Sequence, residues 1–170
     1  MMMIQQTIKS ENLYSTETER YLTEIMNKHP LKEIGFTCSS FDLLHTGHVI
    51  MLEDSKKQCD ILVVALQTDP TLDRNSKNKP VQTYEERFIM LQSIKYLDYV
   101  VKYATEEDLL NILKFLNPSV RILGTDWKDK KYTGDELPIP VYFHDRNHDY
   151  STSNLRKRVH KAEEDILIRK

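Results

Sequence analysis

Hydrophobic and polar residues follow two different periods along this chain. Residues 60–66 form a continuous apolar run after Asp60, as expected of a central parallel strand that is buried on both faces. Shorter β-rich runs predict further strands at 34–38, 98–103, 120–123 and 141–144. The segments around these runs have a helical period instead.

Helical spacing predicts helices at 15–28, 47–58, 84–97, 105–116 and 153–168. Pro30 ends the first of these patterns. Thr83 and Glu86 have the spacing of a capping box at the start of the third helix. The apolar stripe of the last helix is expected to face the core. Its members are Leu155, Val159, Ala162 and Ile166.

Strands that alternate with helices of this length predict an α/β fold, in which a parallel sheet of five strands has helices on both faces. Residues 1–30 precede the alternating pattern and are expected to form a short N-terminal helical extension, with residues 31–170 as the main domain. In such sheets, ligands bind beyond the carboxyl ends of the strands, where the strand order reverses. Functional side chains are therefore expected just after the strands.

Composition limits the partners of the protein. Of its 170 residues, 39% are hydrophobic and 29% are charged, and the formal net charge is −2. Because there is no basic excess, DNA or RNA is not expected as a partner. The N-terminus becomes polar too soon for a signal peptide, and no apolar run approaches the ~20 residues of a membrane helix. We therefore expect a cytoplasmic protein without a membrane partner, in which Cys38 and Cys59 are reduced thiols.

Residues 39–48 carry the most distinctive chemistry, because they join the first strand of the sheet to the next helix. A helix N-terminus offers unpaired backbone N–H groups and a partial positive charge, which attract phosphate. His45 and His48 add imidazole donors there, and Gly47 lets a ligand approach the backbone closely. The sequence leaves open a helix cap, a surface histidine, or a metal site that Asp42 completes.

Two further candidates follow the second strand. The loop 73–80 is basic, and its residues Lys77 and Lys79 either face solvent or reach phosphates. Arg87 lies in the helix after this loop. A surface ion pair with Glu86 is the alternative to a ligand contact for this arginine.

A last group of candidates follows the fourth and fifth strands. Trp127, the single tryptophan, either packs against a ligand or closes its loop. Ser151 and Thr152 would cap the last helix in any protein. With Arg146 shortly before them, they form a candidate phosphate clamp.

The sequence Phe-Asp-Leu-Leu-His-Thr-Gly-His at 41–48 resembles the signature of the HxGH nucleotidyltransferase superfamily. It is most similar to the cytidylyltransferase branch, and within that branch to glycerol-3-phosphate cytidylyltransferases. The likeness extends over about residues 33–160.

Two later segments share in this resemblance. Residues 124–127 are similar to a Gly-Asp-Asp-Trp segment of the same branch, with Thr125 in place of one acid. Residues 146–153 are similar to its Arg-Thr-Glu-Gly-Ile-Ser-Thr-Thr signature, but residues 147–150 differ. Ser39 stands where relatives usually have a glycine.

The resemblance implies a Rossmann-like sheet, a homodimer, and direct attack of an acceptor phosphate on the α-phosphorus of CTP. It implies catalytic roles for His45, His48, Lys77 and Arg146. It implies nucleotide contacts from Ser39, Ser40, Phe41, Asp42, Gly47, Lys79, Arg87, Gly124, Asp126, Trp127, Ser151 and Thr152. Mg²⁺ is expected to arrive on the triphosphate, with Asp42 as a candidate protein ligand.

The motifs thus predict transfer of a cytidylyl group from CTP to a phosphorylated small alcohol similar to glycerol 3-phosphate, which yields a CDP-alcohol and pyrophosphate. An adenylyltransferase that uses ATP and a sugar phosphate is one alternative. A catalytically weak nucleotide-binding module is another, to which Ser39 and the altered segment 146–153 point. In every case the expected partners are a nucleoside triphosphate and a phosphorylated small molecule.

Overall fold

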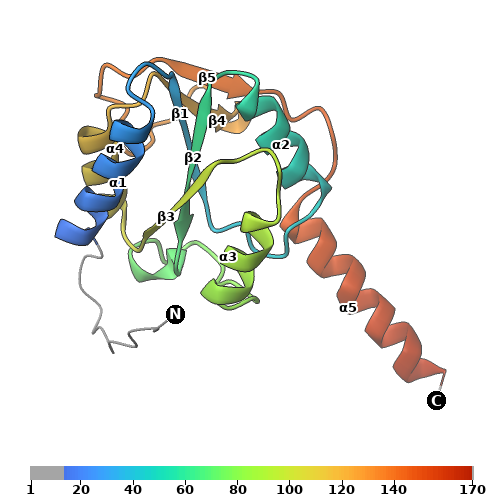
Figure 1. The fold of residues 1–170 in the computed structure, drawn as a ribbon. Helices are drawn as coiled ribbons and strands as arrows, with labels where there is room; N and C mark the ends of the chain where they lie inside the picture. The colour runs from blue at the N-terminus through green and yellow to red at the C-terminus, as the bar shows by residue number, and fades with distance from the viewer. Residues whose placement is uncertain (1–13, 170) are drawn as a thin grey trace.

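A parallel five-stranded sheet forms the centre of the protein in the computed structural model, which describes residues 14–169 (Figure 1). Its strands are β1 (Ile34–Ser39), β2 (Ile61–Gln67), β3 (Tyr99–Tyr103), β4 (Val120–Gly124) and β5 (Val141–His144). Their order in the sheet is β3-β2-β1-β4-β5, and all neighbouring pairs are parallel. The predicted Rossmann-like α/β fold is confirmed.

Helices cover both faces of the sheet. The helices of the described chain are α1 (Thr16–Lys28), α2 (Thr46–Lys56), α3 (Tyr84–Gln92), α4 (Glu106–Leu116) and α5 (Thr152–Ile168), with 3₁₀ turns η1 (Pro70–Leu72) and η2 (Thr125–Trp127). The first four pack on the sheet. In Figure 1, α1 and α4 lie on one face and α2 and α3 on the other. Each face has its own cluster of buried apolar side chains.

The central strand β2 supplies both clusters. All of its residues are buried, and its side chains point alternately to the two faces, as the period of a strand requires. Val63 belongs to the cluster under α1 and α4, whereas Leu62 and Val64 belong to the cluster under α2 and α3. The continuous apolar run therefore reflects burial on both sides, as predicted.

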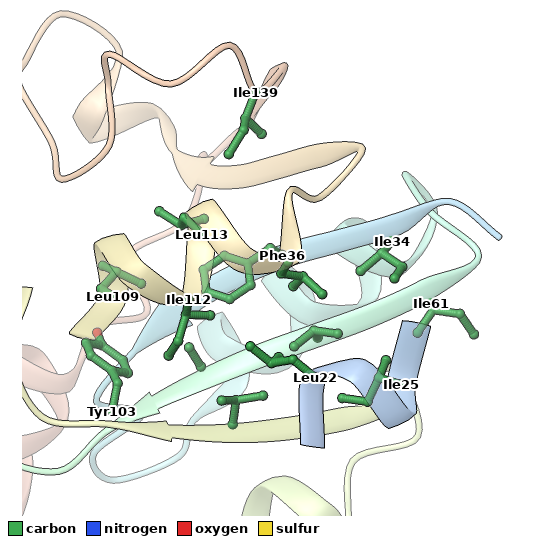
Figure 2. Close-up of a cluster of buried hydrophobic side chains, with 14 residues drawn as sticks. Leu22, Ile25, Ile34, Phe36, Ile61, Tyr103, Leu109, Ile112, Leu113 and Ile139 are labelled. Atoms are coloured by element: carbon green, nitrogen blue, oxygen red, sulfur yellow. The ribbon is translucent and has the colours of Figure 1, made fainter. Parts of the chain in front are cut away.

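The N-terminal helix α1 shares the core of the domain. Ser15 caps it by accepting the backbone N–H of Thr18, and Leu22 and Ile25 are fully buried. Figure 2 shows both side chains pointing into the cluster that Ile112 of α4 completes. Residues 1–13 of the predicted extension lie outside the described residues, and the division at residue 30 stays a prediction.

Two helices differ from the prediction. The capping box of Thr83 and Glu86 opens α3 as expected, but the helix ends at Gln92 instead of 97. Ser93 ends it, and its hydroxyl donates back to the carbonyl of Ile89. The chain must turn here to enter β3, and the apolar residue Leu97 packs on the core from this turn.

The predicted inward stripe of α5 is wrong. Val159 and Ile166 are 55% and 47% exposed, and the helix projects away from the body (Figure 1). Its first turns contact the rest of the protein, where Thr152 and Arg156 form hydrogen bonds to distant parts of the chain. Leu155 of the predicted stripe is partly buried. Val159, Ala162 and Ile166 are exposed, because the helix leaves the body after its first turns.

The strand order reverses between β1 and β4. The chain leaves β1 toward β2 and β3 on one side, and leaves β4 toward β5 on the other. The carboxyl ends of these two strands therefore border the crevice in which ligands of such sheets bind. Within residues 14–169, no helix combines the length and the apolar character that crossing a membrane requires.

Candidate active site

Residues 40–48, which we call the histidine turn, lead from β1 into the start of α2 at this crevice. His45 is the N-cap of α2, where its Nδ1 accepts the backbone N–H of Gly47 at 3.1 Å. Nδ1 of His48 in turn accepts the backbone N–H of His45 at 3.4 Å. The two rings are stacked, with centroids 3.9 Å apart. Since both Nδ1 atoms accept, each neutral ring carries its proton on Nε2, which leaves two imidazole donors at the helix N-terminus.

Long-range contacts hold the turn in a strained conformation. Phe41 and Leu43 have left-handed backbone angles (φ 47° and 49°), which bulky residues rarely adopt. The carboxylate of Asp42 between them accepts the backbone N–H groups of Val81 and Gln82. The side chain of Gln82 accepts the N–H of Leu43 at 2.7 Å. The loop before α3 thus fixes the position of the imidazoles.

Both imidazoles are neutral at physiological pH. Burial lowers the pKa of His48 to about 3, and the nearby His45 and Arg146 contribute to this shift. Burial also lowers the pKa of His45, with smaller contributions from Arg146 and His148. The pair therefore offers neutral N–H donors, and any cationic charge at the site comes from other side chains.

The N-terminus of α5 meets the histidine turn, as the sequence predicts. Oγ1 of Thr152 lies 3.3 Å from Nε2 of His45 and donates to the backbone carbonyl of Asp42. Ser151 caps the helix by accepting the N–H of Asn154. Arg156 pairs with the Asp42 carboxylate at 2.9 Å. Two helix N-termini thus lie beside the same imidazole pair.

A cavity of about 610 Å³ opens next to this junction. The predicted site residues that line it are Ser39, Ser40, Asp42, Lys77, Asp126, Trp127 and Thr152. The imidazoles are not among its lining residues, but Thr152 connects His45 to the cavity. The cavity therefore brings together side chains from all the strand ends that carry the sequence motifs.

Three predicted basic residues differ in their relation to the cavity. Nζ of Lys77 is 5.9 Å from the centre of the Trp127 ring. Arg146 forms a 3.3 Å ion pair with Asp126, and both side chains are about half exposed. Lys79 is outside the cavity lining and contributes its carbonyl oxygen, which accepts from Arg156. Such exposed pairs are weak, so Arg146 is free to exchange Asp126 for a phosphate.

Arg87 lies below the cavity instead of lining it. The side chain is buried, and its guanidinium donates to the backbone carbonyls of Ser40, Gln67 and Thr68 at 2.6–2.7 Å. These carbonyls lie at the ends of β1 and β2. Arg87 thus positions the backbone that forms the floor of the site, and direct contact with a nucleotide stays a prediction.

The sequence did not predict one charged wall of the cavity, which is formed by Arg74, Glu106, Arg121, Tyr132 and Thr133. Arg74 pairs with Glu106 at 3.1 Å, and the hydroxyl of Thr133 also donates to this carboxylate. Arg121 is only 3% exposed, donates to the carbonyl of Thr133 and lies 5.0 Å from the ring centre of Tyr132. All five residues line the cavity. The one available signal was an arginine within the apolar run 120–123, since buried charges are rare.

The described residues offer no protein site for a metal ion. Residues 14–169 contain no group of three histidine, cysteine, aspartate or glutamate side chains that could hold one. Both oxygens of Asp42 are already engaged, by Val81 and Gln82 and by Arg156.

The depressed pKa of His48 predicts a pH-dependent stability. The unfolded histidine titrates near 6.5 and the folded one near 3, so between these values only the unfolded state takes up the proton. Stability is therefore lost as the pH falls from 7 to 4.5. Because His48→Gln removes this proton uptake, the wild type should lose on the order of 2 kcal/mol more unfolding free energy than the variant over this range.

Urea unfolding at a series of pH values measures the difference. His160→Gln, on the exposed part of α5, is the matched control and should follow the wild type. Parallel stability curves for the wild type and His48→Gln would contradict the low pKa.

Comparison with known proteins places this geometry in a family. The cytidylyltransferase-like family matches residues 36–158. The bifunctional protein HldE of Campylobacter jejuni (strain RM1221) is 30% identical over 162 residues, which are 90% of this chain and 35% of that protein. The bifunctional protein HldE of Helicobacter pylori (strain HPAG1) is 33% identical over 140 residues, which are 81% of this chain and 30% of that protein. The chain spans about a third of the length of these curated relatives.

Two solved structures share the fold of this chain. The lipopolysaccharide core biosynthesis protein from Thermoplasma volcanium GSS1 has a TM-score of 0.54 and 27% identity, and the match covers 71% of this chain and 99% of that one. Pantothenate synthetase from Thermus thermophilus shares the fold, with a TM-score of 0.58 and 14% identity over 79% of this chain and 65% of that one. Since the family match covers most of the sequence, this chain belongs to the cytidylyltransferase-like family of nucleotidyltransferases.

Proposed function

We propose that this protein transfers a nucleotidyl group from a nucleoside triphosphate to the phosphate of a polyol or sugar phosphate. An oxygen of the acceptor phosphate attacks the α-phosphorus. The bond from the α-phosphorus to the oxygen that bridges to the β-phosphate breaks, and this oxygen leaves with its electron pair on pyrophosphate. The acceptor phosphate is already ionised, so the reaction needs neither a general base nor an enzyme nucleophile.

One observation carries the proposal: two neutral, stacked imidazoles lie at a helix N-terminus beside a 610 Å³ cavity at the carboxyl ends of a parallel sheet. Negative charge grows on the non-bridging oxygens and the leaving group as the reaction proceeds. Fixed N–H donors stabilise this charge without reorganising. Holding the two substrates in the reactive orientation supplies much of the rest of the rate enhancement. His45 and His48 are suited to that task through their Nε2–H groups.

Cationic side chains complete the charge balance. Lys77 lines the cavity next to Trp127, and Arg146 stands at its rim in a weak surface pair. Both can neutralise the triphosphate, as a nucleotidyl transfer requires. A Mg²⁺ ion on the triphosphate adds positive charge at the leaving group.

The charged wall around Glu106 and Arg121 suits a hydroxylated acceptor. The carboxylate of Glu106 can accept hydrogen bonds from sugar or polyol hydroxyls, and the ring of Tyr132 offers an apolar face. The buried Arg121 adds a fixed donor. Because this wall combines carboxylate, guanidinium and aromatic groups, it favours an acceptor with several hydroxyl groups over an apolar one.

CTP is the donor that the motif resemblance favours, with a glycerol 3-phosphate-like acceptor. ATP with a sugar phosphate is the second candidate, since sugar-phosphate adenylyltransferases share the first motif. The description of the Thermoplasma volcanium relative as a lipopolysaccharide core biosynthesis protein favours a sugar acceptor. Pyrophosphate release with CTP and with ATP, each against a panel of phosphorylated polyols and sugars, separates the two. Nucleotide binding without pyrophosphate release from any acceptor would contradict the proposal and favour a binding module.

Removal of either imidazole should slow the reaction. In His45→Ala or His48→Ala, loss of one preorganised donor should lower kcat about 100-fold or more. The folded state should persist, which thermal unfolding checks. An unchanged kcat in both variants would exclude the imidazoles from the chemical step.

Neutralising Glu106 should weaken acceptor binding alone. Glu106→Gln keeps the shape but loses a charge-assisted hydrogen bond, so the KM for the acceptor should rise about 10-fold while the KM for the nucleotide stays unchanged. Glu107→Gln, at the adjacent exposed position of α4, is the control. A rise in the KM for the nucleotide instead would place the acceptor elsewhere in the cavity.

A further inference from the structure

A third imidazole lies at the histidine turn. His148 belongs to the loop between β5 and α5, and this loop packs on Gly47. A Cβ atom at Gly47 would lie 3.0 Å from Cε1 of His148, 3.0 Å from Cε1 of His45 and 2.9 Å from the carbonyl oxygen of Tyr150. The glycine therefore allows two imidazoles and a backbone segment to close over the same point.

The ring of His148 has no polar partner in the described structure. Both of its nitrogens are shielded from solvent and make no hydrogen bond within residues 14–169. The ring contacts Tyr150, with centroids 5.2 Å apart. Nδ1 of His45 and of His48 is satisfied by a backbone N–H, so His148 alone of the three leaves both nitrogens unpaired. Buried polar atoms without partners are uncommon in native proteins, and a ligand is one way to satisfy them.

The surroundings favour an anion as that ligand. The N-termini of α2 and α5 both lie at this point, and helix N-termini attract negative charge. No group of three metal-binding side chains forms here or elsewhere in residues 14–169, although three histidines are close together. Arg146, two residues before His148 in the same loop, adds a cation at the rim.

We propose that His148 is a further phosphate-binding residue, which donates a ring N–H to the triphosphate when the nucleotide occupies the histidine turn. The inference rests on the proposed function and assigns a ligand contact to a position outside the motif residues. It also gives a role to the altered segment 146–153, in which a histidine stands where similar sequences have a glutamate. A donor replaces an acceptor at that point, which suits a phosphate contact.

Two substitutions separate hydrogen bonding from packing. His148→Phe keeps a ring against Gly47 and Tyr150 but has no N–H, whereas His148→Gln keeps a neutral donor. We expect His148→Phe to raise the Kd for CTP, ATP and pyrophosphate, each with Mg²⁺, by about 10-fold, and His148→Gln by less than about 3-fold. We expect the same loss of affinity for all three ligands, because each contains linked phosphate groups. Isothermal titration calorimetry measures the binding.

The matched control is His160→Phe, an exposed histidine of α5, which should bind like the wild type. Thermal unfolding checks that each variant is folded. Unchanged affinity in His148→Phe would show that the ring only packs, and tighter binding would show that it obstructs the site. Either result overturns the inference.

Failure of this inference is distinguishable from failure of the proposed function. Wild-type pyrophosphate release together with unchanged affinity in His148→Phe overturns only the role of His148. Reduced affinity in His148→Phe without pyrophosphate release by the wild type supports the phosphate contact and contradicts the transferase reaction. A wild type that binds none of the three ligands overturns both.

Discussion

The buried carboxylate of Asp42 joins three parts of the chain that are far apart in sequence. One oxygen accepts the backbone N–H groups of Val81 and Gln82, and the other pairs with Arg156. Burial alone would raise the pKa of this carboxyl, but the N–H donors and Arg156 lower it overall, so its charge is retained at neutral pH. The strained histidine turn, the basic loop and the start of α5 therefore hold their positions together, and Thr152 reaches the imidazoles as a result.

Local sequence patterns were sufficient for the sheet and insufficient for the outer helix. The strand β2 was predictable because burial on both faces requires apolar residues at every position. The capping box of Thr83 and Glu86 was predictable because its partners are close in sequence. The stripe of α5 misled the prediction, because periodicity tells which residues share a face and says nothing about a surface to receive them. Thr152 and Arg156 decide where that helix points, and their partners come from loops more than 70 residues earlier.

The candidate site likewise contains residues that local sequence patterns predict and residues that only the folded structure brings together. Its histidine turn and serine-threonine cap follow strands directly, so the topology of a parallel sheet brings them to one rim. The predicted nucleotide contact of Arg87 stays a prediction, but its hydrogen bonds to three carbonyl groups from the ends of β1 and β2 could not be read from the sequence. The wall of Arg74, Glu106 and Arg121 was not predicted, since its members come from three elements and meet only in the folded protein. An arginine inside an apolar strand was the single local sign of it.

The charges of the site are distributed in a way that suits nucleotidyl transfer. His45 and His48 are stacked at 3.9 Å, so protonation of one disfavours protonation of the other, and burial lowers the pKa of both. In the proposed reaction, a cation such as Lys77 would attract the triphosphate in the ground state and in the transition state alike, which strengthens binding more than it speeds the reaction. Neutral donors held in a rigid turn contribute most when the reacting oxygens reach one particular position. In the proposed reaction, the strained backbone around Asp42 would therefore contribute to the rate, because it fixes the donors before the substrate arrives.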